Sequence, residues 1–273
     1  MRLRSLLFVP GDRPDRMAKA AASGADALIL DLEDAVSLER KQAARAAVAA
    51  FLAEPCACMR LVRINPLDSG LIADDLAAVL PARPDGLVLP KAEGAASLAR
   101  LDSPAALPIL PIATETPAAI FQLGSYAAVA DRLLGLTWGA EDLPAAIGAA
   151  TAREADGRFT PPYELARSLT LFGAHAAGVA AIETVYPDFR DLEGLAAYAA
   201  RGRRDGFTGM MAIHPSQVSV INAAFTPSDA ELDHARRVVA AFDANPGAGV
   251  LALDGKMIDA PHLKAARRVL GMG

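Results

Sequence analysis

Cysteine is scarce in this chain, which excludes a fold held together by disulfides. The only cysteines among 273 residues are Cys56 and Cys58. Two thiols so close in sequence cannot cross-link distant parts of a fold. We therefore expect a protein of a reducing compartment, the cytoplasm.

Long apolar runs and basic clusters are also missing. No stretch approaches the roughly 18 apolar residues that span a bilayer, and the run Ser5–Val9 is far shorter than the core of a signal peptide. The net charge is −5, the isoelectric point is about 5.4, and the longest basic stretch is Arg201 to Arg204. We therefore expect neither a membrane partner nor a nucleic-acid partner.

Apolar sequence is abundant and is arranged as short runs between longer helical segments. Apolar residues make up 53% of the chain, enough for a large core. Eight steps from a strand to a helix favour parallel strands joined by right-handed crossovers, an α/β fold of the (β/α)8 TIM-barrel type. An open doubly wound sheet is the alternative, although no Gly-x-Gly-x-x-Gly fingerprint supports a dinucleotide fold. The predicted strands are Ser5–Val9, Ala27–Leu32, Leu61–Ile64, Gly86–Leu89, Leu107–Ala113, Leu133–Trp138, Val179–Val185 and Met211–Ile213, and the clearest helices are Arg40–Leu52, Leu71–Leu80 and Tyr163–Ala177.

The pattern changes after residue 226, which separates a predicted catalytic barrel (1–226) from a small C-terminal extension (227–273). A charged helix from Asp229 to Asp243 precedes a breaker rich in glycine, Asn245–Gly249. Residues 250–259 predict two short strands around an Asp-Gly turn, followed by a helix from near Pro261. A unit this small should pack against a barrel, either its own or a neighbour's.

Carboxylates follow two of the predicted strands. Glu115 comes directly after one buried run, and Asp142 comes shortly after the next. Active sites of parallel barrels collect at the carboxyl ends of strands, and Mg²⁺ prefers oxygen ligands, so this pair predicts a magnesium site. Each acid also precedes a proline in a way that suits a helix N-terminus, and capping is an equally good explanation for either residue alone.

Further charges are expected at the same end of the barrel. Arg63 would hold the carboxylate of an α-keto acid through its two-pronged donor geometry, or it would serve as a structural ion-pair partner. Asp31, Glu33 and Asp34 are too many for direct ligation, so we expect one or two of them to hydrogen-bond water on the metal. His214 fits a structural role as well as a catalytic one.

A second group of residues lies in the first strand and helix. Phe8, Arg13 and Lys19, joined by Lys91 from the fourth strand, surround a turn rich in glycine and proline. A helix N-terminus with nearby cations can bind phosphates. Without further support, a lone arginine and lysine on a first helix are more often a solvated face.

These residues fall in ordered motifs that resemble the citrate lyase β-subunit and malyl-CoA lyase family of Mg²⁺-dependent carbon–carbon lyases. The resemblance runs nearly end to end. It implies a (β/α)8 barrel whose C-terminal extension reaches the active site of an adjacent subunit in a homotrimer or hexamer. The motifs are Leu7-Phe-Val-Pro-Gly-Asp-Arg-Pro14, Leu30-Asp-Leu-Glu-Asp-Ala35, Arg63-Ile-Asn65, Leu89-Pro-Lys91, Glu115-Thr-Pro117, Gly139-Ala-Glu-Asp-Leu143, Ile213-His-Pro-Ser-Gln217 and Asp254-Gly-Lys-Met-Ile-Asp259.

The resemblance also implies residue roles. Glu115 and Asp142 match the two metal ligands, and Arg63 matches the group on the keto acid. Backbone amides around Gly139 and Ala140 would hold the substrate carboxylate. Asp259 matches the acid that handles a proton at the acetyl methyl carbon. The residues that match positions holding coenzyme A are Phe8, Arg13, Lys19 and Lys91.

The implied reaction cleaves a citryl-, malyl- or citramalyl-type acyl-CoA to an acyl-CoA and oxaloacetate, glyoxylate or pyruvate. Two alternatives use the same site: a malyl-CoA-type thioesterase, and a citrate lyase β-subunit that takes its thioester from an acyl carrier protein. A non-enzymatic binding module is the remaining alternative. One departure concerns substrate choice, because Met210 and Met211 stand where many relatives have a lysine shortly before the His-Pro pair.

Overall fold

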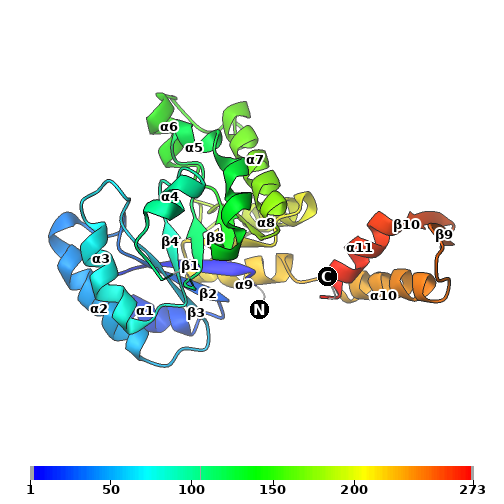
Figure 1. Cartoon of the computed structure of the whole chain (residues 1–273), viewed down its shortest axis with the longest axis horizontal. Coiled ribbons are helices and arrows are strands. Elements are labelled where there is room, and N and C mark those ends of the chain that lie inside the picture. Colours follow the sequence, from blue (N-terminus) through cyan, green and yellow to red (C-terminus); the bar gives the residue numbers. More distant parts are fainter. Residues whose placement is uncertain (1–2, 105, 272–273) are drawn as a thin grey trace. The chain divides into compact units, whose positions relative to one another are not determined.

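The computed structural model describes residues 3–104 and 106–271 and contains eight parallel strands that alternate with helices along the chain (Figure 1). Each strand is three to six residues long, and most of their residues are buried. The strands are β1 Ser5–Pro10, β2 Ala27–Asp31, β3 Met59–Arg63, β4 Gly86–Leu89, β5 Ile109–Pro111, β6 Gly135–Thr137, β7 Ala180–Glu183 and β8 Gly209–Ala212.

The strands form a (β/α)8 barrel, as predicted. Strand β1 pairs in parallel with both β2 and β8, so the first strand closes the sheet onto the last. The continuous ladder runs β5-β4-β3-β2-β1-β8-β7-β6. Between β5 and β6 only isolated bridges remain, such as Ile112 opposite Thr137, and this β5/β6 seam completes the barrel.

Helices lie outside the strands, as Figure 1 shows for α1 to α3. One apolar cluster fills the space between helices and strands, and a second, which includes Leu6, Ile112 and Met211, fills the interior of the barrel. The helices of this part are α1 Pro14–Ala21, α2 Lys41–Ala53, α3 Ile72–Val79, α4 Ala95–Arg100, α5 Pro117–Ile120, α6 Asp142–Ile147, α7 Pro161–Ala177, α8 Leu192–Asp205 and α9 Pro215–Ala224, with 3₁₀ turns η1 Leu38–Arg40, η2 Leu80–Ala82 and η3 Leu123–Arg132.

Three predicted strands are shorter in the structure by three or four residues: the run 179–185 yields only the four residues of β7, and the other two flank the seam. The runs 107–113 and 133–138 yield only three residues each in β5 and β6, the two strands that flank the seam. Pro111 has no N–H to donate to a ladder, and beyond it the hydroxyl of Thr114 bridges to Gly139. Both runs contribute apolar side chains to the core, but only part of each run forms the backbone pairing of a strand.

The chain divides into two compact units, 1–225 and 226–273. The second unit contains α10 Asp229–Asp243, β9 Val250–Leu253, β10 Lys256–Asp259 and α11 Ala260–Val269. Ser228 and Glu231 form a capping box at the start of α10. The turn of the hairpin has positive φ at Asp254 and Gly255, as an Asp-Gly two-residue turn requires. The hairpin and both helices were predicted, and their apolar sides share a small core around Val238 and Ile258.

Among residues 3–104 and 106–271, no helix is long and apolar enough to cross a membrane.

Candidate active site

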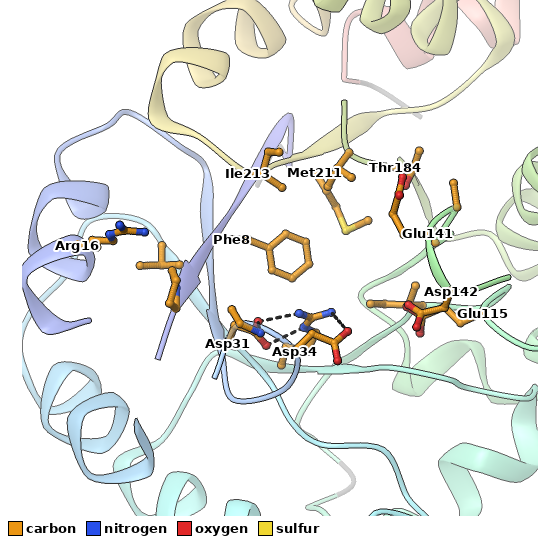
Figure 2. A pocket seen from close by; sticks show the side chains of 18 residues that line it. Phe8, Arg16, Asp31, Asp34, Glu115, Glu141, Asp142, Thr184, Met211 and Ile213 are labelled. Atoms are coloured by element: carbon orange, nitrogen blue, oxygen red, sulfur yellow. Dashed lines mark hydrogen bonds and ion pairs between the residues drawn. The ribbon is translucent and has the colours of Figure 1, made fainter. Parts of the chain in front are cut away.

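A cavity of about 460 Å³ opens at the carboxyl ends of the barrel strands (Figure 2). It is lined by residues from the ends of seven strands or from the loops that follow them, which is where a parallel barrel places its chemistry. Predicted site residues found in this wall are Phe8, Asp31, Asp34, Arg63, Glu115, Gly139, Ala140 and Asp142.

Glu115 is the most deeply buried acid of the predicted metal pair. Its side chain is only 4% exposed, and its Oε2 accepts a hydrogen bond of 2.6 Å from the backbone N–H of Lys91. Burial, reinforced by the negative charges of Glu33 and Asp142, raises the pKa of Glu115 to about 8. Asp142 begins α6 and is about one-third exposed. Figure 2 shows both side chains at the same side of the cavity.

Gly139 leaves the space that Glu115 occupies. A Cβ at this position would lie 2.8 Å from Cγ of Glu115 and 3.0 Å from its Oε1. The backbone of Gly139 is held across the seam by Thr114, whose hydroxyl accepts from the N–H of Gly139 and donates to its carbonyl, both at 3.1 Å. The glycine of the Gly139-Ala-Glu-Asp142 segment therefore lets the β6 loop approach the metal candidate closely.

The guanidinium of Arg63 is paired with acids from the end of β2 and the loop that follows it. Its Nε and Nη2 each donate to a carboxylate oxygen of Asp31 at 2.7 Å. Its Nη1 lies 2.8 Å from Oε2 of Glu33, although the angles there are not those of a hydrogen bond. Burial lowers the pKa of Arg63, but the hydrogen bonds and charges of Asp31 and Glu33 outweigh it and keep the group charged. The ring of Phe8 packs 4.8 Å from the guanidinium carbon.

Asp31 supports Arg63 and the loop that follows β2. Besides the two bonds from Arg63, it accepts the backbone N–H groups of Glu33 and Ala35 at 2.8 and 3.0 Å. Four donors leave this carboxylate little capacity for a further water. Asp34 is more exposed and lies 3.9 Å from Arg63.

Lys91 lies between Glu33, in the loop after β2, and Asp142, at the start of α6. Its ammonium lies 2.8 Å from Glu33 and 3.7 Å from Asp142. Burial lowers the pKa of Lys91, but its partners outweigh that effect and raise the pKa to about 12. Lys91 also has φ of +51°, a left-handed conformation that is costly for a residue with a side chain. In this conformation its N–H meets the carboxylate of Glu115.

A buried lysine that sequence reasoning missed shapes the loop after β2. The ammonium of Lys41 donates to the carbonyls of Leu32 and Glu33 and to the side chain of Asn65, at 2.6 to 2.8 Å. Asn65, from the Arg63-Ile-Asn65 motif, in turn donates to Asp75 at 2.7 Å. The motif thus has a structural part: it fixes the loop that presents Asp31, Glu33 and Asp34.

A second cavity of about 450 Å³ lies beside the first helix. It is lined by three of the four residues expected to hold coenzyme A, namely Phe8, Arg13 and Lys19. Arg13 is paired with the neighbouring Asp15 at 3.1 Å. The structure does not bring Lys91 to this cavity, because its ammonium is held between Glu33 and Asp142.

The two remaining candidates are helix caps. His214 caps α9 together with Gln217, and its ring stacks on Phe189 with centroids 4.8 Å apart. Asp259 caps α11 in the second unit, where its carboxylate lies 2.5 Å from Nδ1 of His262. The hydrogen bond from His262 lowers the pKa of Asp259, so this group is ionised at neutral pH.

The donor set suits a magnesium ion that keeps several non-protein ligands. Within the described ranges, no group of three or more His, Cys, Asp or Glu side chains could hold a metal ion. Glu115 and Asp142 supply two carboxylates, and Mg²⁺ is commonly bound by one or two carboxylates plus water and substrate oxygens. A buried carboxyl with a raised pKa is also a group that a divalent cation would stabilise in its charged form.

The sequence did not identify several residues that line this cavity, most of them apolar. A charged motif draws attention by its rarity in a core, whereas an inward-facing aliphatic residue at a strand end looks like ordinary core. The strand alternation could have shown Ile112 and Met211 as inward-facing. The unassigned lining residues include Arg16, Ile112, Thr184, Val185, Met211 and Ile213.

Comparisons with known proteins agree on one family. Residues 4–215 match the HpcH/HpaI aldolase/citrate lyase family. A citrate lyase subunit beta-like protein from Mycobacterium tuberculosis is 39% identical over 264 residues, covering 97% of this chain and 93% of the relative. A (3S)-malyl-CoA thioesterase from Cereibacter sphaeroides is 36% identical over 276 residues, covering 98% of this chain and 93% of that protein.

A solved structure gives the same result. The crystal structure of the CitE protein of Mycobacterium tuberculosis, in complex with magnesium, acetoacetate and coenzyme A, superposes with a TM-score of 0.86. It is 38% identical in sequence, and the match covers 99% of this chain and 98% of that one.

Proposed function

Because the chain belongs to the HpcH/HpaI aldolase/citrate lyase family and is a carbon–carbon lyase of the citrate lyase β-like type, we propose that it cleaves a malyl-, citramalyl- or citryl-type acyl-CoA. The products are an α-keto acid and a shorter acyl-CoA. The observation that carries the proposal is the convergence of Glu115 and Asp142 beside Gly139 in one cavity, next to an arginine whose charge is secured by its partners.

Glu115 and Asp142 would hold the magnesium ion. When bound, the ion acts as a Lewis acid that polarises the carbonyl of the keto acid. Backbone N–H groups at Gly139 and Ala140 would hold the substrate carboxylate. The charge of Arg63, which stays fixed because Asp31 grips two of its nitrogens, would offset the negative charge that develops on the substrate oxygen.

Asp259 would handle the proton at carbon. In cleavage, the substrate hydroxyl passes its proton to water, its oxygen becomes the carbonyl oxygen of the keto acid, and the bond between C2 and C3 breaks with its electron pair passing to C2. The resulting enolate of the acyl-CoA takes up a proton at C2, which Asp259 would deliver directly or through water. In condensation the same carboxylate accepts the proton, a task for which its lowered pKa keeps it ionised. The proposal admits two arrangements: Asp259 serves its own barrel, or it serves the barrel of another subunit in a homotrimer or hexamer.

The cavity beside α1 would receive coenzyme A. Arg13 and Arg16 present cations at the start of that helix and Lys19 presents one in its last turn. Phe8 lines both this cavity and the one that contains the metal candidates. Lys91 lines neither cavity and would instead hold the carboxylates of Glu33 and Glu115 in place. We further propose that the protein acts in the cytoplasm.

Product analysis tests the proposal. Purified protein is incubated with Mg²⁺ and malyl-CoA, citramalyl-CoA or citryl-CoA, and keto acid and free thiol are measured separately. Keto acid without thiol supports the lyase. Thiol without keto acid would replace the proposal with a thioesterase, the activity named for the Cereibacter sphaeroides relative. If neither forms, the lyase on free coenzyme A esters is rejected, and an acyl-carrier-protein thioester becomes the substrate to try.

A further inference from the structure

A buried carboxylate that the proposed reaction does not use joins the ends of strands β6 and β7. Glu183 is the last residue of β7 and is completely buried. Its Oε1 accepts a hydrogen bond of 2.6 Å from the indole N–H of Trp138, the buried residue that directly follows β6. The same oxygen accepts the backbone N–H of Thr184 at 3.0 Å. One carboxylate therefore fixes the two strand ends relative to each other.

This carboxylate is itself held by the helices outside the barrel. Arg167 of α7 donates from Nε to its Oε2 at 2.7 Å, and the hydroxyl of Tyr198 in α8 donates to its Oε1 at 3.0 Å. Arg167 also donates to Asp205 at 2.8 Å. Gly202 of α8 packs so close that a Cβ there would lie 3.3 Å from Oε2. Hydrogen bonds to a charged group are strong in a buried network, so the indole meets a rigid partner.

Strand β6 has a regular ladder on one side only. It pairs with β7 as far as Thr137 opposite Ile182, whereas the described residues across the β5/β6 seam form only isolated bridges. The bond between indole and carboxylate joins the next two residues in register, Trp138 and Glu183. A side-chain bond therefore continues the connection between β6 and β7 one step beyond the end of the backbone ladder.

Beyond Trp138 the chain enters the wall of the catalytic cavity. Gly139 and Ala140 line this cavity, and in the proposed function their backbone receives the substrate carboxylate. Thr114 binds the backbone of Gly139 across the seam. On the side of β7, Thr184 lines the same cavity (Figure 2). The segment that would bind the carboxylate thus follows directly on the residue that Glu183 holds.

We propose that Glu183 is a positioning residue for the lyase reaction, an inference that rests on the proposed function. Through the indole of Trp138 it fixes the backbone at Gly139 and Ala140 where the substrate carboxylate binds. Glu183 is not among the residues that line the cavity, so it acts through Trp138 and not on the substrate. Placement matters here, because a displacement of about 1 Å in such a group can cost on the order of 100-fold in rate.

Two matched variants separate positioning from a purely structural role. Trp138→Phe and Tyr198→Phe each remove one donor to Oε1 of Glu183 and keep an aromatic ring. Both should lower the urea midpoint of unfolding, since each removes a hydrogen bond to a buried carboxylate. Only Trp138→Phe should release the segment that follows β6. A purely structural role would affect the function of the two variants equally.

Binding of the keto acid is the decisive readout. With Mg²⁺ present, glyoxylate, pyruvate and oxaloacetate are titrated calorimetrically into each whole protein. For the keto acid that the wild type binds most tightly, Trp138→Phe should raise Kd by at least about tenfold and Tyr198→Phe by less than about threefold, since residues that orient a binding group commonly contribute 10- to 100-fold. KM for the cleaved thioester should rise with this Kd in Trp138→Phe.

A replacement that conserves volume removes the N–H without leaving a cavity. Trp138 is the only tryptophan of the chain, so expression in a tryptophan auxotroph supplied with β-(3-benzothienyl)alanine exchanges this residue alone for an analogue with sulfur in place of N–H. The analogue protein should lose keto acid binding as Trp138→Phe does, and it decides the question if Trp138→Phe does not fold.

Undiminished keto acid binding in the analogue protein overturns the positioning role, as do equal losses in Trp138→Phe and Tyr198→Phe. Either result, in a wild type that releases keto acid from a thioester, overturns this inference alone. No keto acid from any thioester would instead overturn the proposed function.

Discussion

Replacing Gly139 by alanine should disable the proposed metal site while leaving the fold intact. The added Cβ would lie 2.8 Å from Cγ of Glu115 and 3.2 Å from Cγ2 of Ile112. Ordinary contact between carbons is about 3.5 to 4.0 Å, so the carboxylate must move by roughly 1 Å. Its oxygen is held at 2.6 Å by the N–H of Lys91, which leaves it few places to go.

A displacement of about 1 Å in a catalytic group can cost on the order of 100-fold in rate. We expect Gly139→Ala to lower kcat/KM by about that factor and to weaken Mg²⁺ binding, as measured by steady-state kinetics at several metal concentrations. The matched control is Gly124→Ala, since a Cβ there meets nothing within 4 Å. A Gly139→Ala enzyme within about twofold of wild type in both quantities would refute the claim that this glycine makes room for a catalytic carboxylate.

Two further predictions concern stability. Since the pKa of Glu115 is about 8 in the folded protein and near 4.5 when unfolded, the native state binds more protons between these values. Without divalent metal, stability should therefore fall as pH rises from about 5 to 8, by at most about 1.4 kcal/mol per pH unit, and Glu115→Gln should flatten this slope in urea titrations. Arg167→Met removes the partner of the buried Glu183, 2.7 Å away, and should cost about 3 to 5 kcal/mol of unfolding free energy. The same change at Arg158, whose side chain is 76% exposed, should cost less than about 1 kcal/mol. Equal losses of unfolding free energy in the two variants would contradict the claim that burial makes the Arg167–Glu183 pair the more costly one to break.

The barrel was predictable because its strands are short apolar runs between longer helical segments. That periodicity is a local property of the sequence, and it placed Ala27–Leu32 and Gly86–Leu89 within one residue of the observed strands β2 and β4. The strands at the β5/β6 seam were overestimated, because an apolar run does not reveal where backbone pairing stops. Strand β8 starts at Gly209, two residues before the predicted start, because Met210 already pairs with the first strand while facing the outer core.

The acids of the candidate site could be predicted from the sequence, whereas the lysines that bind or position them could not. Rare charged residues at strand ends indicated Glu115, Asp142 and Arg63 without any knowledge of distances. The assignment of Lys91 to coenzyme A did not anticipate its ion pairs, because they depend on a left-handed backbone turn and on the packing of three loops. Lys41 was missed because its buried ammonium is bound mostly by carbonyl groups, which leave no trace in the sequence pattern.

The position of the metal is tested most directly by titrating the protein with Mn²⁺, as a paramagnetic substitute for Mg²⁺, and counting bound ions by electron paramagnetic resonance. Wild-type protein should bind one Mn²⁺ per chain, displaceable by Mg²⁺. Glu115→Gln and Asp142→Asn should each lose this binding. Asp34→Asn, which removes an exposed acid from the same cavity, should keep it. Undiminished binding in both Glu115→Gln and Asp142→Asn would contradict the assignment of these two carboxylates as the metal ligands.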